Sequence, residues 1–211
     1  MEIINQLSSQ IGDKSEASNK IVAQKCIQTP KLLDDIVIGF NSKDKKLVGD
    51  CIEVFTMVSD TNPELIISYS AKIIDLLKSK ETRIRWEATH SLANISRKIP
   101  DTILSILPLF QELIQNDKSI IVRDYSIDAI ANLADVNEIY SEKAFELLKY
   151  SLELWGERHG KQVFQGFYNV LKFHPNYKNE IETLAEPFIN AKKGTVAKAA
   201  KKVIKRANEI K

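Results

Sequence analysis

Glycine and proline, the residues that most often interrupt helices, are scarce in this sequence. Seven glycines and six prolines occur among 211 residues, which is too few for a chain rich in β-turns or for a disordered chain. Long apolar runs are also missing, because charged residues interrupt every hydrophobic stretch before it reaches the about 20 residues that cross a bilayer. We therefore expect a helical protein without a membrane-spanning segment.

Cysteine is scarce as well. Cys26 and Cys51 are the only two, they form no CxxC pair, and each lies on an apolar helical face. Buried thiols fit this pattern better than a disulfide or a zinc site, so we expect neither a metal nor a cofactor. The first residues lack the basic stretch of a secretory signal, and the expected location is the cytoplasm.

One phrase of the sequence occurs twice. The segment 84–96, IRWEATHSLANIS, returns as 122–134, VRDYSIDAIANLA. In both, apolar residues recur every three or four positions, the spacing of one helix face. In both, an arginine in the second place is followed nine residues later by an asparagine. Self-similarity of this kind is the signature of a repeat architecture.

Weaker copies extend the repeat along the whole chain. Their helices share a small residue near the middle, and these residues lie 34 to 40 positions apart: Cys51, Ala88, Ser126, Gly166 and Ala200. A small residue in mid-helix lets a neighbouring helix approach closely. We therefore predict one continuous domain of about six helix pairs, with approximate repeats 1–28, 30–60, 63–98, 101–135, 138–174 and 177–211. Within the fourth pair, Pro108 predicts a kink in the helix 103–115.

Two features of the repeat resemble a known superfamily. The dipeptides Ile84-Arg85 and Val122-Arg123 each follow an acid after a short gap, which resembles the HEAT signature. The segment 88–95, ATHSLANI, is similar to the groove helix of armadillo repeats, Ala-x-Trp-Ala-Leu-Ser-Asn-Ile. The chain thus resembles the HEAT/armadillo superfamily of α-solenoids. The resemblance implies an all-α fold in which helix pairs stack into a right-handed superhelix.

The resemblance also implies a binding surface, because in this superfamily the second helix of each repeat lines a concave face. The residues expected there combine aromatics, acids and amides: Trp86, His90, Asn94, Asp124, Asp128, Asn132 and Tyr168. Such a surface suits an extended peptide or a helix with basic and apolar side chains. The asparagine amides are expected to bind a partner's backbone. We therefore predict a monomeric, non-catalytic scaffold or adaptor that binds a protein segment.

The C-terminal residues support an alternative. From residue 190 to residue 211 there are eight lysines or arginines and one acid. Four of the lysines lie opposite the apolar stripe of the last helix: Lys198, Lys201, Lys202 and Lys205. They form either a polar cap of the solenoid or an anion site that binds nucleic acid.

One form of this alternative is an enzyme that resembles the HEAT-like alkylpurine DNA glycosylases, and that resemblance would make Trp86, Asp124, Trp155 and Arg158 the site residues. The expected groove holds more acids than bases, however, and acids repel phosphate. The sequence has no Gly-rich phosphate loop, nucleophile elbow or HExxH motif either. We therefore expect no enzymatic activity and favour a protein partner.

Overall fold

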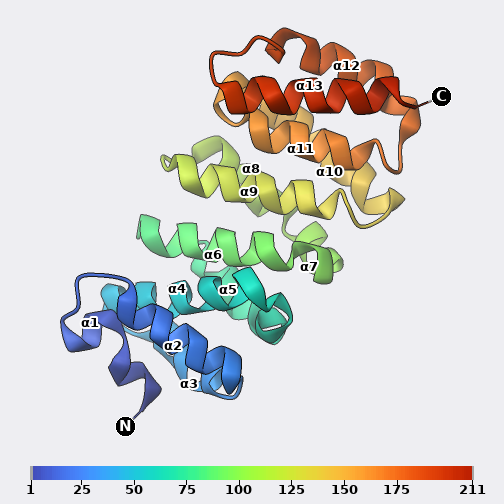
Figure 1. Cartoon of the computed structure of the whole chain (residues 1–211). Coiled ribbons are helices and arrows are strands. Elements are labelled where there is room, and N and C mark those ends of the chain that lie inside the picture. Colours follow the sequence, from blue (N-terminus) through green and yellow to red (C-terminus); the bar gives the residue numbers. More distant parts are fainter. Residues whose placement is uncertain (1, 211) are drawn as a thin grey trace. The chain divides into compact units, whose positions relative to one another are not determined.

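The computed structural model describes residues 2–210, and within that range every regular element is a helix. Contacts cluster into two compact units, residues 1–98 and 99–211, which we call the N-terminal and the C-terminal unit and describe separately (Figure 1). No helix in residues 2–210 is long and apolar enough to cross a membrane. A single domain over the whole chain stays a prediction.

The N-terminal unit consists of helices joined by short turns. Its elements, with 3-10 helices marked η, are η1 (Ile3–Gln6), α1 (Ser8–Ile11), α2 (Ala17–Gln28), α3 (Leu32–Ile38), η2 (Gly39–Asn41), α4 (Lys45–Thr61), η3 (Pro63–Tyr69), α5 (Ser70–Leu76), α6 (Thr82–Ile95) and η4 (Ser96–Lys98). The helices α2, α4 and α6 pack side by side, and α3 and α5 pack against them. Each of α2, α4 and α6 is the second helix of a pair.

The C-terminal unit repeats this arrangement. Its elements are α7 (Pro100–Ser105), α8 (Leu107–Asn116), α9 (Ile120–Leu133), α10 (Glu138–Trp155), η5 (Gly156–Arg158), α11 (Gly160–Val170), η6 (Pro175–Tyr177), α12 (Lys178–Ala185), η7 (Glu186–Phe188) and α13 (Gly194–Asn208). The second helices α9, α11 and α13 are neighbours in that order, and α8, α10 and α12 pack behind them. The predicted all-α fold of helix pairs is therefore confirmed.

Several helices begin where a polar side chain caps the first turn. The Asp44 carboxylate accepts a hydrogen bond from the backbone N of Lys46 at 2.9 Å, which starts α4. Ser119 and Asn137 cap α9 and α10 in the same way. Such caps satisfy backbone N–H groups that have no partner inside the helix.

The predicted kink at Pro108 is wrong, because the helix is interrupted instead. The helix α7 ends at Ser105, and α8 begins at Leu107. Pro108 consequently lies in the first turn of α8, where its missing N–H removes no helical hydrogen bond. A proline in mid-helix would have removed one.

The small residues in the second helices allow close packing, as their spacing indicates. All of them, from Cys51 to Ala200, are buried. At Gly166 on α11 a Cβ atom would lie 2.5 Å from Cδ1 of Leu148 and 3.2 Å from Cβ of Ala131. Any side chain there would therefore push α11 away from both α10 and α9. The core of each unit depends on these close approaches.

Candidate functional site

The residues predicted to line a binding face fall into two sets, one in each unit. Trp86, His90 and Asn94 lie one turn apart on α6. Asp124, Asp128 and Asn132 lie one turn apart on α9, and Tyr168 lies on the neighbouring α11. All of these side chains are half-buried. We describe each set within its own unit, and their roles as binding residues stay predictions.

In the N-terminal unit, His90 and Asn94 both bind Asp60 at the end of α4. Nε2 of His90 lies 3.2 Å from Oδ1 of Asp60. The Asn94 amide nitrogen donates to the same oxygen at 2.8 Å and to Oγ of Ser59 at 2.9 Å. The hydrogen bond from His90 contributes most to holding the pKa of Asp60 below its usual range. Both amide hydrogens of Asn94 are thus used, and only its carbonyl oxygen remains for a partner.

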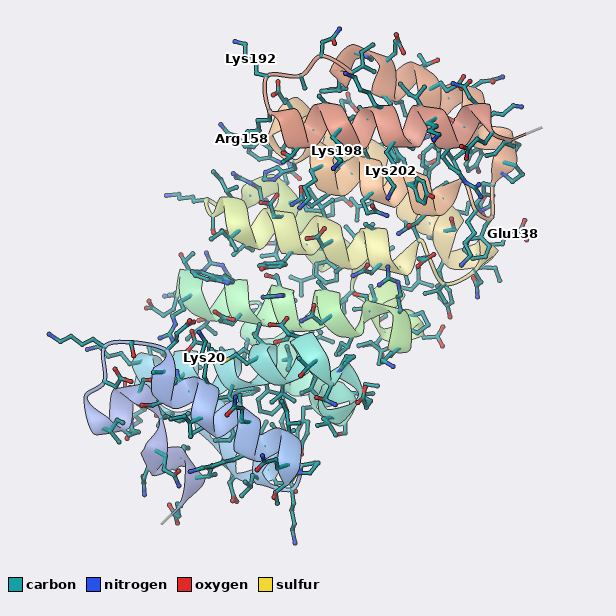
Figure 2. The ribbon with its side chains drawn as sticks, in the orientation of Figure 1. Lys20, Glu138, Arg158, Lys192, Lys198 and Lys202 are labelled. Atoms are coloured by element: carbon teal, nitrogen blue, oxygen red, sulfur yellow. The ribbon has the colours of Figure 1, made fainter. Side chains whose placement is uncertain are left out.

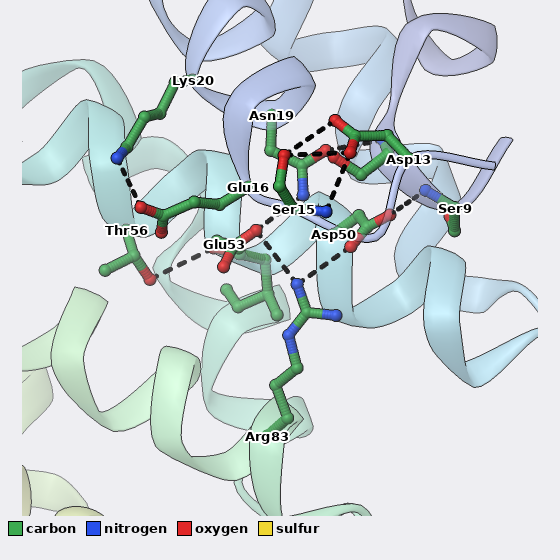
Figure 3. Close-up of polar contacts among 12 residues, drawn as sticks. Ser9, Asp13, Ser15, Glu16, Asn19, Lys20, Asp50, Glu53, Thr56 and Arg83 are labelled. Carbon is green, nitrogen blue, oxygen red and sulfur yellow. Dashed lines mark hydrogen bonds and ion pairs between the residues drawn. The ribbon is translucent and has the colours of Figure 1, made fainter. Parts of the chain in front are cut away.

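Another polar network of this unit is centred on Arg83 of α6, which binds two carboxylates of α4 (Figure 3). One Nη of Arg83 donates to Asp50 at 2.9 Å and to Glu53 at 3.0 Å. The Asn19 amide from α2 also donates to Glu53, at 2.6 Å, and the backbone N of Ser9 donates to Asp50 at 2.7 Å. Burial alone would raise the pKa of Asp50, but the hydrogen bonds of this carboxylate with Ser9, Asn19 and Arg83 hold that pKa below its usual range. The network joins α2, α4 and α6, and Arg83 neutralises part of the acidic charge of α4.

Glu87 is the buried acid of α6. Only 4% of its surface is exposed, and burial raises the pKa of its carboxyl group to about 7. A hydrogen bond with Thr56 opposes that rise, whereas the charge of Glu53 adds to it. The charge of Glu87, which packs against α4, therefore changes near neutral pH.

In the C-terminal unit, the repeat arginine of α9 is the centre of a buried cluster. Arg123 is 4% exposed. One Nη donates to the backbone carbonyl of Asp117 at 2.6 Å, and Nε donates to Nε2 of His159 at 3.1 Å. Its guanidinium carbon lies 4.0 Å from the centre of the Trp155 ring, and the indole N–H of Trp155 donates to the Ile114 carbonyl at 2.8 Å. These contacts stabilise the connection from α10 to α11.

The hydrogen bonds of His159, which is fully buried, indicate which of its ring nitrogens donates. Because Nε2 accepts from Arg123, the ring hydrogen lies on Nδ1. Nδ1 is 2.6 Å from Oδ1 of Asp124 and therefore donates to that carboxylate.

Three of the residues considered for a glycosylase site lie in the C-terminal unit. Asp124, Trp155 and Arg158 lie around His159, with the Arg158 guanidinium carbon 5.5 Å from the Trp155 ring centre. Asp124 is bound to His159, and Trp155 is covered by Arg123. These groups thus bind one another instead of surrounding a space for a nucleobase. Trp86 belongs to the N-terminal unit.

One lysine of α13, Lys202, reaches the predicted binding face of the same unit. Val196, Ala200, Val203 and Ala207 are buried, as the apolar stripe indicates, while the four lysines opposite them are exposed. Nζ of Lys202 lies 4.3 Å from the ring centre of Tyr168. Lys201 and Lys205 instead border a groove of about 470 Å³ beside η7. The residues predicted for peptide binding and those predicted for anion binding therefore meet at Tyr168.

Some polar groups that organise these faces were not identified from the sequence. They are Asp60, the Arg83 network with Asp50 and Glu53, and the link from Arg123 to His159. Their partners lie 30 to 36 positions away, about one repeat, and this spacing of polar residues was the available signal. Among residues 2–210, no group of three or more His, Cys, Asp or Glu side chains is placed to hold a metal ion.

Comparison with known proteins supports the fold. No protein-family model matches the sequence, and no curated protein is significantly similar to it. Among solved structures, a designed armadillo repeat protein in complex with the peptide (KR)4 is 18% identical, with 98% of each chain covered and a TM-score of 0.72. Computationally designed armadillo repeat proteins for modular peptide recognition match at 18% identity, with 97% of this chain and 98% of the other covered and a TM-score of 0.72. An engineered protein is 14% identical over 99% and 97% of the two chains, with a TM-score of 0.66.

Proposed function

Starting from an armadillo/HEAT-like solenoid fold, we propose that the protein is a non-catalytic scaffold that binds a segment of another protein. The binding surface is the exposed side of α9, α11 and α13, which we call the C-terminal face. Its residues are Asp124, Asp128, Asn132, Tyr168, Lys198 and Lys202. One observation carries the proposal. The half-buried aromatic Tyr168 lies on α11, between α9, which bears acids, and α13, which bears lysines.

The kinds of side chain on this face, and their rigid placement, favour binding of a peptide. A tyrosine gives a large contact area at a small loss of conformational entropy, and exposed charges around it favour one partner over others. The packed second helices hold these side chains on rigid elements, so little free energy is lost in ordering the site. Among the solved structures of similar fold, one designed armadillo repeat protein is in complex with the peptide (KR)4, and others were designed for modular peptide recognition. The trio on α6, Trp86, His90 and Asn94, is proposed as a second surface for the same purpose.

Selection of peptides from a random display library on the purified chain tests the proposal. We expect a family of related sequences, and the variant Tyr168→Ala should weaken their binding about tenfold or more. Tyr150→Ala is the matched control, because Tyr150 is also half-buried but lies on the first helix α10. Failure to select any sequence, or equal losses in the two variants, would count against a peptide-binding face.

The exposed lysines of α13 favour nucleic acid as the second candidate partner. This helix carries five basic residues and no acid. If it binds phosphates, affinity for an oligonucleotide should fall steeply with salt and be lost in Lys198→Glu/Lys202→Glu. Recovery of a partner from lysate with and without nuclease treatment separates the two candidates, since only a protein partner survives the nuclease.

A further inference from the structure

The ionisable side chains of the C-terminal face are sorted by helix. The acids Asp124 and Asp128 lie on α9, whose single base, Arg123, is buried in its own cluster. All ionisable residues of α13 are basic, and Lys198 and Lys202 are exposed. The helix α11 between them has no acid. One edge of the face is therefore acidic and the opposite edge basic.

Packing sets the order of these edges. The helix α11 contacts both α9 and α13. Towards α9, the Asn169 amide donates to the Ala131 carbonyl at 2.8 Å. Towards α13, Lys202 lies over Tyr168, and Figure 2 shows Lys198 and Lys202 along the same side of α13, next to α11. The acidic and basic edges are therefore separated by the width of one helix.

We infer that this face binds a segment of mixed charge, with basic residues over α9, an apolar residue near Tyr168 and acidic residues over α13. The inference rests on the proposed function and specifies its partner. A segment that carries only basic residues, such as the peptide (KR)4 bound by one of the similar designed proteins, would meet Lys198 and Lys202 with like charge. A wholly acidic segment would meet Asp124 and Asp128.

The width of the face gives the spacing of the charges. Packed helices lie about 8–10 Å apart, so the axes of α9 and α13 are separated by about 16–20 Å. An extended chain rises about 3.3 Å per residue. The basic and acidic residues of the bound segment should consequently be about five or six positions apart.

Peptides of equal length and equal apolar centre test the inference by fluorescence anisotropy with the whole chain. One is wholly basic, one is wholly acidic, one has a basic and an acidic half, and one alternates the same charges. The alternating peptide controls for composition, because only the order of charges differs. We expect the peptide with separated charges to bind about tenfold more tightly than each of the others, and the difference to shrink at high salt.

Charge-reversed variants show which edge of the face binds the basic residues of the peptide and which binds the acidic ones. In Lys198→Glu/Lys202→Glu the face becomes acidic throughout, and the wholly basic peptide should become the best ligand. The control Lys72→Glu/Lys143→Glu changes net charge by the same amount. Lys72 and Lys143 are exposed on the first helices α5 and α10, so the order of affinities should not change.

The outcomes separate this inference from the function on which it rests. If the wholly basic peptide binds best to the unaltered chain, or if separated and alternating charges bind equally, the inference is overturned while peptide binding stands. If none of the peptides binds, and library selection also fails, the proposed function itself is overturned. An oligonucleotide that binds where no peptide does would assign the lysines of α13 to nucleic acid instead.

Discussion

Arg85 and Arg123 occupy the same place in two copies of the repeat but lie in different surroundings. Each donates from one Nη to a backbone carbonyl six positions earlier, Ser79 or Asp117, as expected for an arginine that holds the loop before its helix. Arg85 is half-buried, whereas Arg123 is buried and also bonds to His159 and stacks on Trp155.

This difference predicts unequal losses of stability. Arg123→Ala should lower the free energy of unfolding of the C-terminal unit by about 3 kcal/mol, because buried partners lose a charged donor. Arg85→Ala should cost the N-terminal unit about 1 kcal/mol. Urea titrations followed by tryptophan fluorescence measure both, since Trp86 and Trp155 lie in different units and each can be replaced by phenylalanine to isolate the other. Equal losses would contradict this reading of the two sites.

Glu87 should make the stability of the N-terminal unit depend on pH. Its folded pKa of about 7 lies above the ordinary value of 4.5, so the folded state binds the proton more tightly than the unfolded state. The stabilisation by this proton is complete below about pH 4.5 and is lost as the pH rises through about 7. We therefore expect Glu87→Gln to stabilise the unit at pH 8. The change that it causes in the free energy of unfolding should be up to about 3 kcal/mol more favourable at pH 8 than at pH 5.

Thermal unfolding at a series of pH values checks this prediction, with Trp86 as the reporter. Glu64→Gln removes an exposed carboxyl of the same unit and is the control, for which we expect no such trend. The explanation would be wrong if Glu87→Gln had the same effect at pH 5 and at pH 8.

Gly166 should tolerate no side chain. Alanine favours a helix over glycine by about 1 kcal/mol, but its Cβ would lie 2.5 Å from a methyl group of Leu148, which is fully buried. Gly166→Ala should therefore destabilise the C-terminal unit by about 1–2 kcal/mol. Gly194→Ala is the matched control, because nothing lies within 4 Å of its Cβ position, and it should change stability by less than about 0.5 kcal/mol. Differential scanning calorimetry of the two variants measures both changes in stability, and equal changes would contradict the close approach at Gly166.

The cysteines should be unreactive while the N-terminal unit is folded. Burial raises the pKa of the Cys26 thiol to about 11 and that of Cys51 to about 12, and both side chains are fully buried. Alkylation at pH 8 followed by mass spectrometry should then be limited by opening of the unit, and the rate should rise in urea. Modification at the rate of a free thiol would contradict their burial.

The sequence predicted the helices well because their determinants are local. Apolar spacing and the small residues at Cys51 and Gly166 each act within one helix or across one packed contact. The sequence predicted a kink at Pro108, whereas the structure has a break at Ile106, because whether a chain bends or breaks beside a proline depends on neighbouring contacts.

The candidate site was less predictable. Its residues were chosen by helix face, and the structure shows the chosen side chains half-buried. Their partners, such as Asp60 for Asn94 and His159 for Asp124, depend on the register between neighbouring helices. A one-turn shift would exchange those partners without changing any helix, so periodicity within a helix does not determine them.

The span of the polar contacts has a consequence for how the chain acquires its structure. The bonds that Arg83, Asn94, Arg123 and Trp155 make to the neighbouring repeat join residues 30 to 41 positions apart. None of these bonds has to wait for distant ends of the chain to meet, so the entropy of loop closure stays small and contact order is low. Within each unit, a helix pair can dock on the one before it as it leaves the ribosome, and folding proceeds by propagation along the sequence.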